Sequence, residues 1–161
     1  MTIKEGDAIP SVNLKIMSEK GVSDISTDEI FSNKKVVLFS VPGAFTPTCS
    51  AQHLPGFIDH ADLIKEKKVD TIVCMSVNDA FVMDAWGKDR GAGEKVLMVA
   101  DGNGDFTKAL GLELDAKGFG LGMRSQRFSM IVDNGSVSQL NVEEGGGFEV
   151  SKAEVILDQL S

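Results

Sequence analysis

The sequence predicts an α/β fold in which a mixed central sheet has helices on both faces. Dense runs of β-branched and aromatic residues recur at 34–41, 69–77 and 95–101, and each has the length of a buried strand. Segments with helical spacing of apolar residues separate these runs, which is the pattern of parallel strands joined by helical crossovers. Asn134-Gly135 lies between two further strand-like runs and is a strong hairpin signal, so antiparallel strands join the sheet.

The first elements precede the first buried run. Residues 12–16 alternate weakly between apolar and polar and predict an early strand. Ser26 followed by Glu29 fits a capping box, which predicts a short helix through Phe31. The run at 34–41 then forms the first buried strand.

Two longer helices follow. We expect one from Thr46 to Lys67, interrupted at Pro55 because proline disrupts helical hydrogen bonding. After the strand at 69–77, residues 78–88 predict a second helix with an apolar stripe. The stripe comprises Phe81, Val82, Ala85 and Trp86.

The last third of the chain holds two short helices around the hairpin. Asp105 is expected to cap a helix that Gly111 ends. Ser151 with Glu154 predicts the start of a final helix that runs to Leu160.

Length and composition suit one globular domain over residues 1–161, since 42% of the residues are hydrophobic and 25% are charged. The net charge of −8 argues against partners that are nucleic acids or anionic membranes. No apolar run approaches the ~20 residues of a spanning helix. The N-terminus is too polar for a secretory signal, and two cysteines are too few for a disulfide scaffold, so we expect a reducing, cytoplasmic setting.

Cys49 lies at the start of the first long helix, in "SVPGAFTPTCSAQHLPGF" (40–57). With Thr46 as the N-cap, Pro47 is the first helical residue, a position that tolerates its missing N–H, and Cys49 is the third. The sulfur then faces the positive end of the helix dipole, close to the Thr46 hydroxyl. Both effects favour the thiolate, the nucleophilic form of cysteine.

The other candidate residues carry alternatives. Cys49 itself could be a small buried hydrophobe, but its rigid polar turn favours chemistry. Cys74 lies in a strand that is apolar on both faces, which favours packing over a role as partner thiol. His53 could act as a base for Cys49, although a structural hydrogen bond is the favoured role. Arg124 and Arg127 are equal candidates, on local pattern, for a cation that fixes a thiolate.

Metal binding is disfavoured by the sequence. Two cysteines and two histidines lack zinc-ligand spacing. The segment that begins at Asp101 opens like a calcium loop, but Phe106 and Leu112 occupy the positions that need glycine and glutamate. We therefore expect no metal and no other cofactor.

Four segments together resemble one family. "PGAFTPTCSAQHLPGF" is similar to the active-site segment of type II (peroxiredoxin-five-like) peroxiredoxins, and "CMSVNDAFVMDAW", "DGNGDFTKALG" and "RSQRFSMIVDNG" resemble three further segments of that family, in order. The resemblance covers nearly the whole chain. It implies a thioredoxin-like fold and the reduction of hydrogen peroxide and alkyl hydroperoxides. It assigns peroxide attack to Cys49, a contact with thiolate and peroxide to Thr46, shielding of the pocket to Pro42, and the active-site arginine to Arg127.

The resemblance also implies partners. These are a hydroperoxide substrate, an external thiol reductant (glutathione with glutaredoxin, or thioredoxin) and a second copy of the chain in a homodimer built from loops around the active site. Some members of the family carry a second cysteine near the C-terminus, but residues 143–154 contain none. This difference favours a one-cysteine cycle.

Two other classes of function remain open on the residues alone. A cysteine hydrolase would use Cys49 with His53, but no third group to orient the histidine is evident. A non-catalytic redox sensor or chaperone would use the same thiol stoichiometrically.

Overall fold

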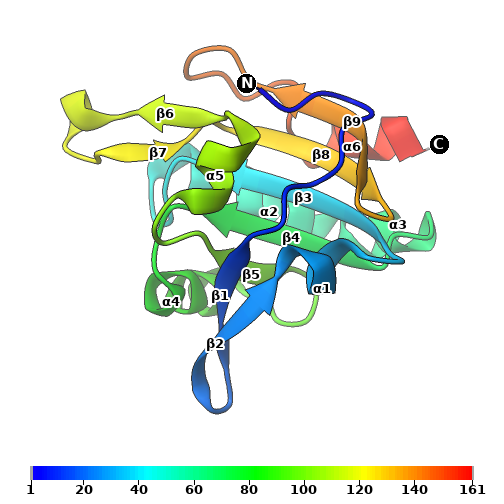
Figure 1. The fold of residues 1–161 in the computed structure, drawn as a ribbon, viewed down its shortest axis with the longest axis horizontal. Coiled ribbons are helices and arrows are strands. Elements are labelled where there is room, and N and C mark those ends of the chain that lie inside the picture. The colour runs from blue at the N-terminus through cyan, green and yellow to red at the C-terminus, as the bar shows by residue number, and fades with distance from the viewer. Residues whose placement is uncertain (1, 161) are drawn as a thin grey trace.

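The computed structural model describes residues 2–160, and within them one sheet of seven strands forms the centre (Figure 1). Its strands are β1 (Asn13–Ser18), β2 (Gly21–Ser26), β3 (Lys35–Val41), β4 (Thr71–Ser76), β5 (Leu97–Ala100), β8 (Phe128–Asp133) and β9 (Ser136–Val142). They lie in the order β2-β1-β5-β4-β3-β8-β9. Strands β3, β4 and β5 are parallel, and the remaining pairs are antiparallel. The mixed sheet predicted from the sequence is confirmed.

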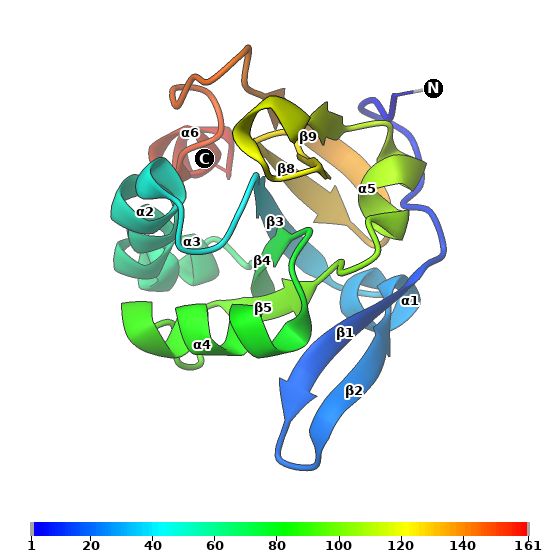
Figure 2. The same cartoon turned by 90° about the vertical axis from the view of Figure 1, so that its left-hand side faces the viewer.

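Helices cover both faces of this sheet (Figure 2). They are α1 (Thr27–Phe31), η1 (Cys49–His53), α2 (Leu54–Asp59), α3 (Ala61–Glu66), α4 (Ala80–Arg90), α5 (Asp105–Leu110), η2 (Lys117–Phe119) and α6 (Ala153–Leu160). A two-stranded sheet of β6 (Glu113–Asp115) and β7 (Met123–Ser125) extends from one end. Helices α2, α3, α4 and α6 pack on one face, and α1 and α5 pack on the other.

Alternation along β3 explains why two cores form. Val37 and Phe39 enter the cluster under α2, α4 and α6, whereas Val36 and Leu38 enter the cluster under α1 and α5. Successive side chains of a strand point to opposite faces, so a strand that is apolar throughout must be covered on both sides. The dense apolar runs therefore place Cys74 deep in a two-sided sheet, while Cys49, in the π-helical turn, packs into the core on one face of it.

The capping box and the hairpin are confirmed. Ser26 Oγ accepts a hydrogen bond from the backbone N–H of Glu29, and the Glu29 carboxylate accepts one from the Ser26 N–H. Asn134 and Gly135 adopt φ angles of 48° and 79°, the left-handed conformations that a tight hairpin turn requires. The sequence did not indicate β2, β6 and β7, which are partly exposed strands.

The predicted interruption of the long helix at Pro55 is wrong. Helical structure begins at Pro47, widens into a π-helical turn over Cys49–His53, and continues through Pro55 to Asp59. The break comes instead at His60, whose ring Nδ1 donates a hydrogen bond to the Gly56 carbonyl at 2.8 Å. The wide turn lies directly before the proline, where a regular i→i−4 bond would be lost in any case.

Three local expectations need correction. Helix α4 buries Ala80, Met83, Trp86 and Gly87, whereas Phe81 of the predicted stripe is 66% exposed.

The start of α5 is held by Asp101 rather than Asp105, because the Asp101 carboxylate accepts bonds from the N–H groups at 106 and 107. Ser151 does not cap the last helix, since its hydroxyl donates to Glu143.

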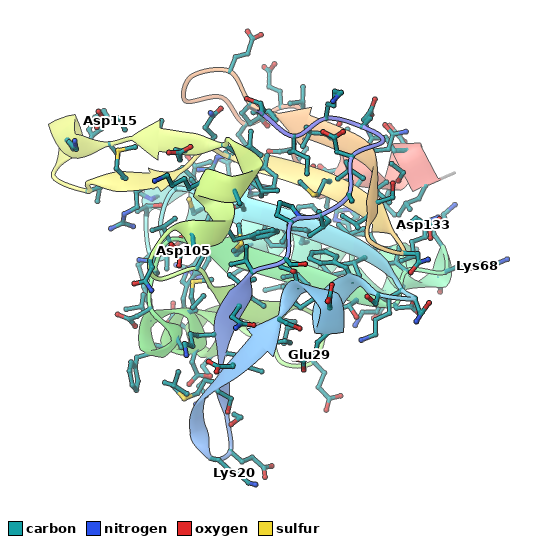
Figure 3. The ribbon with its side chains drawn as sticks, in the orientation of Figure 1. Lys20, Glu29, Lys68, Asp105, Asp115 and Asp133 are labelled. Atoms are coloured by element: carbon teal, nitrogen blue, oxygen red, sulfur yellow. The ribbon has the colours of Figure 1, made fainter. Side chains whose placement is uncertain are left out.

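Charged side chains lie around the periphery. Lys20 and Lys68 lie in turns, Asp115 and Asp133 end strands β6 and β8, and all four lie near the edges of the molecule (Figure 3). Among residues 2–160, no helix combines the length and the apolarity needed to cross a membrane.

Candidate active site

Cys49 lies fully buried at the first residue of the π-helical turn, two residues after the helix begins at Pro47. Cys49 follows the carboxyl end of β3 and the turn that connects β3 to the helix. Phe45 has a φ of 64°, and the resulting tight turn lets the chain enter the helix directly after the strand. The expected place of Cys49 in the first helical turn is thus found, with its backbone at the positive end of the helix.

Arg127 supplies the charge at the sulfur. It stands directly before β8, which pairs with β3, and its Nη2 donates to Cys49 Sγ at 3.1 Å. The second arm of the guanidinium, Nη1, lies 2.9 Å from His53 Nδ1. The same guanidinium lies 5.9 Å from the centre of the Phe148 ring. The half-buried guanidinium thus places a positive charge at hydrogen-bond distance from the sulfur.

His53 holds Arg127 in place rather than acting on the sulfur. Because Arg127 Nη1 has only protons to donate, His53 Nδ1 must be the unprotonated nitrogen. Its Nε2 is then protonated and donates to the Ser151 carbonyl at 3.0 Å. Burial, and next the charge of Arg127, lower the pKa of His53 to about 3, although the bond to Ser151 opposes the change. The ring is neutral, and the structural role preferred for it is confirmed.

Ser151 is itself fixed by a carboxylate. Glu143 Oε2 accepts bonds from the Ser151 hydroxyl at 2.6 Å and from the backbone N–H groups of Glu149, Val150 and Ser151 at 2.8, 2.9 and 2.8 Å. Burial raises the pKa of Glu143, but these bonds outweigh it and hold that pKa below its usual range. Both Glu143 and Ser151 are buried.

Thr46 and Pro42 lie in the turn before Cys49. The Thr46 hydroxyl donates to the Gly43 carbonyl at 2.6 Å, which gives it a partner in the turn. The carbonyl of Pro42 accepts a bond from Arg124 Nη1 at 3.3 Å. Arg124 therefore supports the turn, and of the two arginines it is Arg127 that meets the sulfur.

Comparison with known proteins assigns this arrangement to a family. Residues 4–157 match the Redoxin family. The chain is 51% identical to Peroxiredoxin-2D of Arabidopsis thaliana over 159 residues, which cover 98% of each chain. It superposes with a TM-score of 0.96 on the crystal structure of reduced Prx3 in complex with H₂O₂ from Vibrio vulnificus, at 55% identity, covering 99% of this chain and 100% of that one. This chain is a peroxiredoxin of the Redoxin family.

A third similarity concerns the Plasmodium falciparum antioxidant protein, described as a 1-Cys peroxiredoxin. Its structure gives a TM-score of 0.91 at 35% identity and covers 98% of each chain. These similarities confirm the thioredoxin-like fold and the enzyme class expected from the sequence. The peroxiredoxin is a thiol-dependent peroxidase.

The second cysteine of this peroxiredoxin is enclosed in the sheet. Cys74 lies in β4, opposite Phe39 of β3, and belongs to the same core cluster as Cys49. Burial, and next the nearby Cys49, raise the pKa of the Cys74 thiol. Both cysteines are free in the structure. Cys74 is therefore far less reactive as a nucleophile than a surface thiol would be.

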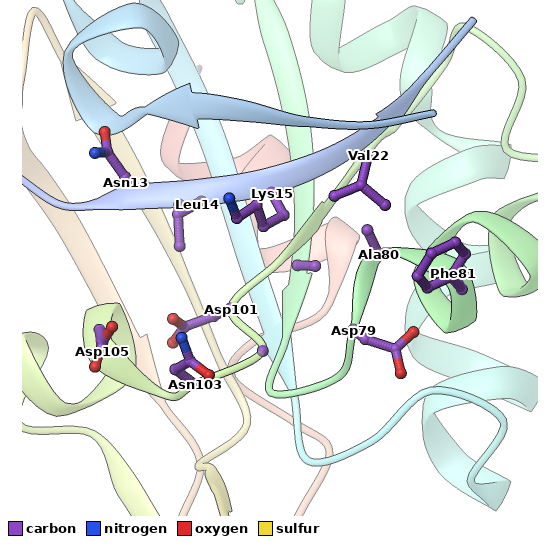
Figure 4. Close-up of a pocket in the computed structure, with 12 residues that line it drawn as sticks. Asn13, Leu14, Lys15, Val22, Asp79, Ala80, Phe81, Asp101, Asn103 and Asp105 are labelled. Atoms are coloured by element: carbon purple, nitrogen blue, oxygen red, sulfur yellow. The ribbon is translucent and has the colours of Figure 1, made fainter. Parts of the chain in front are cut away.

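A pocket elsewhere in the peroxiredoxin has a structural explanation. It measures about 220 Å³ and lies between the β1–β2 hairpin, the start of α4 and the end of β5 (Figure 4). Three of its four charged side chains have partners, since Asp101 holds α5, Asp79 caps α4, and Lys15 pairs with Asp24. The fourth, Asp105, is the first residue of α5. Among residues 2–160, no group of three or more His, Cys, Asp or Glu side chains is arranged to hold a metal ion.

Sequence reasoning missed Glu143 and Phe148 as parts of the site. No motif marks either residue, because the contacts arise from how the loop after β9 closes. The one signal available was Ser151, which was interpreted as a helix cap. A polar residue that precedes a helix can either cap the helix or form a hydrogen bond with a nearby buried carboxylate, and which of the two it does depends on how the loop buries it.

Proposed function

We propose that Cys49 is the residue of this peroxiredoxin that attacks the hydroperoxide. The observation that carries the proposal is the 3.1 Å contact between Arg127 Nη2 and Cys49 Sγ. A guanidinium held against a sulfur stabilises the thiolate, and the thiolate is the nucleophile in reactions with peroxides. Cys74 has no such neighbour at hydrogen-bond distance among the described residues.

The reaction begins with attack of the thiolate on the terminal peroxide oxygen. The S–O bond forms as the O–O bond breaks, the sulfur is oxidised to sulfenic acid, and the peroxide is reduced. The departing hydroxide or alkoxide takes up a proton and leaves as water or an alcohol. Arg127 stabilises the negative charge as it moves from the sulfur to the leaving oxygen. We assign hydrogen peroxide and alkyl hydroperoxides as substrates.

Thr46 and Pro42 control the approach to the sulfur in this proposal. Both are half-buried, and they flank the turn that delivers Cys49. The Thr46 hydroxyl proton is directed to Gly43, which leaves its oxygen lone pairs free to accept a hydrogen bond from a peroxide. Pro42 has no N–H, so it shields the site without competing for the substrate.

An external thiol completes the cycle. It condenses with the sulfenic acid to form a mixed disulfide and release water. A second external thiol then attacks the mixed disulfide, which releases the Cys49 thiolate and leaves a disulfide between the two external thiols. The burial of Cys74 in β4 supports a one-cysteine cycle of this kind. Glutathione with glutaredoxin, or thioredoxin, is the proposed reductant, and the cytoplasm is the proposed compartment.

The proposed assembly is a single-domain chain in a homodimer. Three exposed aromatic residues support it, and they lie in the turn before η1, at the start of α4 and in η2. These residues are Phe45, Phe81 and Phe119, exposed by 52%, 66% and 86%. Exposed aromatic side chains are typical of interfaces.

The test is peroxide consumption with an excess of a dithiol reductant. Cys49→Ser should abolish turnover, because serine oxygen does not form the sulfenic acid. Cys74→Ser is the matched control and should retain turnover. Full turnover by Cys49→Ser would refute the proposal, and loss of turnover by a folded Cys74→Ser protein would contradict the one-cysteine cycle.

A further inference from the structure

Glu143 is a buried carboxylate that touches none of the reacting atoms. Among residues 2–160 it has no ion pair, and four donors of the segment Glu149–Ser151 surround one of its oxygens. A buried charge needs such compensation, because desolvation without partners costs several kcal/mol. If Glu143 only filled space, an apolar residue would do so without the free-energy cost of desolvating a carboxylate. Its set of hydrogen bonds therefore indicates a specific structural function.

The geometry around Glu143 leads stepwise to the sulfur. The carboxylate fixes Ser151, and the Ser151 carbonyl accepts the Nε2 proton of His53 at 3.0 Å. This bond determines that His53 Nδ1 is unprotonated, which is the form that can accept a hydrogen bond from Arg127. Arg127 in turn donates to Cys49 Sγ.

The loop between Glu143 and Ser151 contributes a second contact. Phe148 directly precedes the N–H groups that bind the carboxylate, and its ring lies 5.1 Å from the His53 ring and 5.9 Å from the Arg127 guanidinium carbon. Gly147 allows the loop to close, since a Cβ there would come within 3.3 Å of Glu143 Oε1. The carboxylate thus gathers the loop whose aromatic residue covers both His53 and Arg127.

We propose that Glu143 is a positioning residue for the reaction of Cys49, acting through Ser151 and His53 on Arg127. The proposal rests on the function proposed above for Cys49. Glu143 selects the tautomer of His53 and holds the Phe148 loop, so that the guanidinium is already directed at the sulfur when peroxide arrives.

The experiment combines two readouts on Glu143→Gln. Glutamine is close in size but carries no charge, so its amide oxygen accepts the four hydrogen bonds more weakly than the carboxylate oxygen does. The second-order rate constant for oxidation of Cys49 by hydrogen peroxide, from stopped-flow measurements, should fall roughly tenfold. Long-range ¹H–¹⁵N spectra should show His53 protonated at Nε2 in the parent protein and a second tautomer or the protonated ring in Glu143→Gln. His60 is the other histidine, so His60→Gln assigns the signals.

Glu144→Gln is the matched control, because Glu144 is the exposed neighbour of Glu143, and it should change neither readout. If Glu143→Gln does not fold, Ser151→Ala removes one of the four donors and should move both readouts in the same direction by less. Unchanged rates and unchanged His53 signals in the folded variant would overturn the proposal, as would a lower rate with an unaltered His53 spectrum. The spectra do not depend on turnover, so they test the positioning role even if Cys49 proves not to be the attacking residue.

Discussion

Arg127 makes two directed contacts at once, to Cys49 Sγ and to His53 Nδ1. A guanidinium can do this because its donors lie in one rigid plane, whereas the ammonium of lysine is a single mobile charge. His53 therefore matters through its neutral state, which leaves a lone pair for the arginine. A protonated ring would repel the guanidinium and release it from the sulfur.

The pH dependence of stability should reveal this neutral histidine. Burial, with the charge of Arg127, lowers the pKa of His53 from 6.5 to about 3. Below pH 6.5 the unfolded chain therefore binds a proton at His53 that the folded chain does not bind. Because the unfolded state then holds more protons, the free energy of unfolding falls as the pH is lowered through 6.5 toward 3. Thermal unfolding between pH 7 and pH 5 should show a weaker pH dependence in His53→Gln than in the parent protein.

The control for this measurement is His60→Gln, which leaves His53 in its site. Equal slopes for the parent protein and His53→Gln would contradict the neutral, buried state of the ring.

At the level of single residues, the sequence identified the sulfur and the arginine but not their supports. Cys49 could be found because its neighbours form a helix start with a known electrostatic effect. Arg127 was separated from Arg124 by resemblance alone, since the local pattern made the two arginines equal candidates. Glu143 was not predicted as part of the site, because its contacts form only when the loop that follows it brings Glu149–Ser151 back to its carboxylate. No periodic pattern in the sequence signals such a contact.

The π-helical turn is the element on which the site depends. It carries Cys49 and His53 at its two ends, and both side chains reach Arg127. Ser50 anchors the turn to the neighbouring helix, because its Oγ accepts the indole N–H of Trp86 in α4 at 2.9 Å. Trp86 is fully buried, so bulk solvent does not reach its indole N–H to replace this acceptor.

Ser50→Ala should therefore destabilise the protein by about 1–3 kcal/mol, the usual cost of leaving a buried donor without a partner. Chemical denaturation measures this difference. In a Trp86→Phe background the same substitution should cost much less, since the donor is then absent. An equal cost in both backgrounds would show that the hydrogen bond does not anchor the turn.

Regular elements were predictable where the apolar pattern was strong. The buried strands were found because both of their faces are covered, which produces continuous apolar runs. The π-helical turn could not be foreseen, since one additional residue in a helical turn leaves the composition of the segment unchanged. Phe81 was misplaced because an exposed aromatic residue has the same effect on a helical pattern as a buried one.

At the scale of the whole molecule, the sheet separates two cores, and the β6–β7 extension carries an exposed aromatic side chain away from both. Phe119 is 86% exposed at the tip of the β6–β7 extension. An exposed aromatic residue on a protruding hairpin is costly for an isolated chain, and a second copy would cover it. This supports the proposed homodimer.

Sedimentation should give a mass of twice 17.2 kDa for the parent protein and shift toward the monomer for Phe119→Asp. Leu63→Asp is the matched control, because Leu63 is 52% exposed in α3, at the opposite end of the molecule (Figure 1). Its mass should stay that of the parent. A parent protein that sediments as a monomer at micromolar concentration would contradict the proposal.

The bond between Ser50 and Trp86 has an optical consequence. Trp86 is the one tryptophan in the sequence, and its indole is tied to the residue that follows Cys49. Its emission wavelength and intensity depend on whether that hydrogen bond and the dry surroundings persist. The native chain therefore carries its own fluorophore, hydrogen-bonded to the neighbour of Cys49 in the sequence, and a step that disturbs this bond should change the emission in real time without a label.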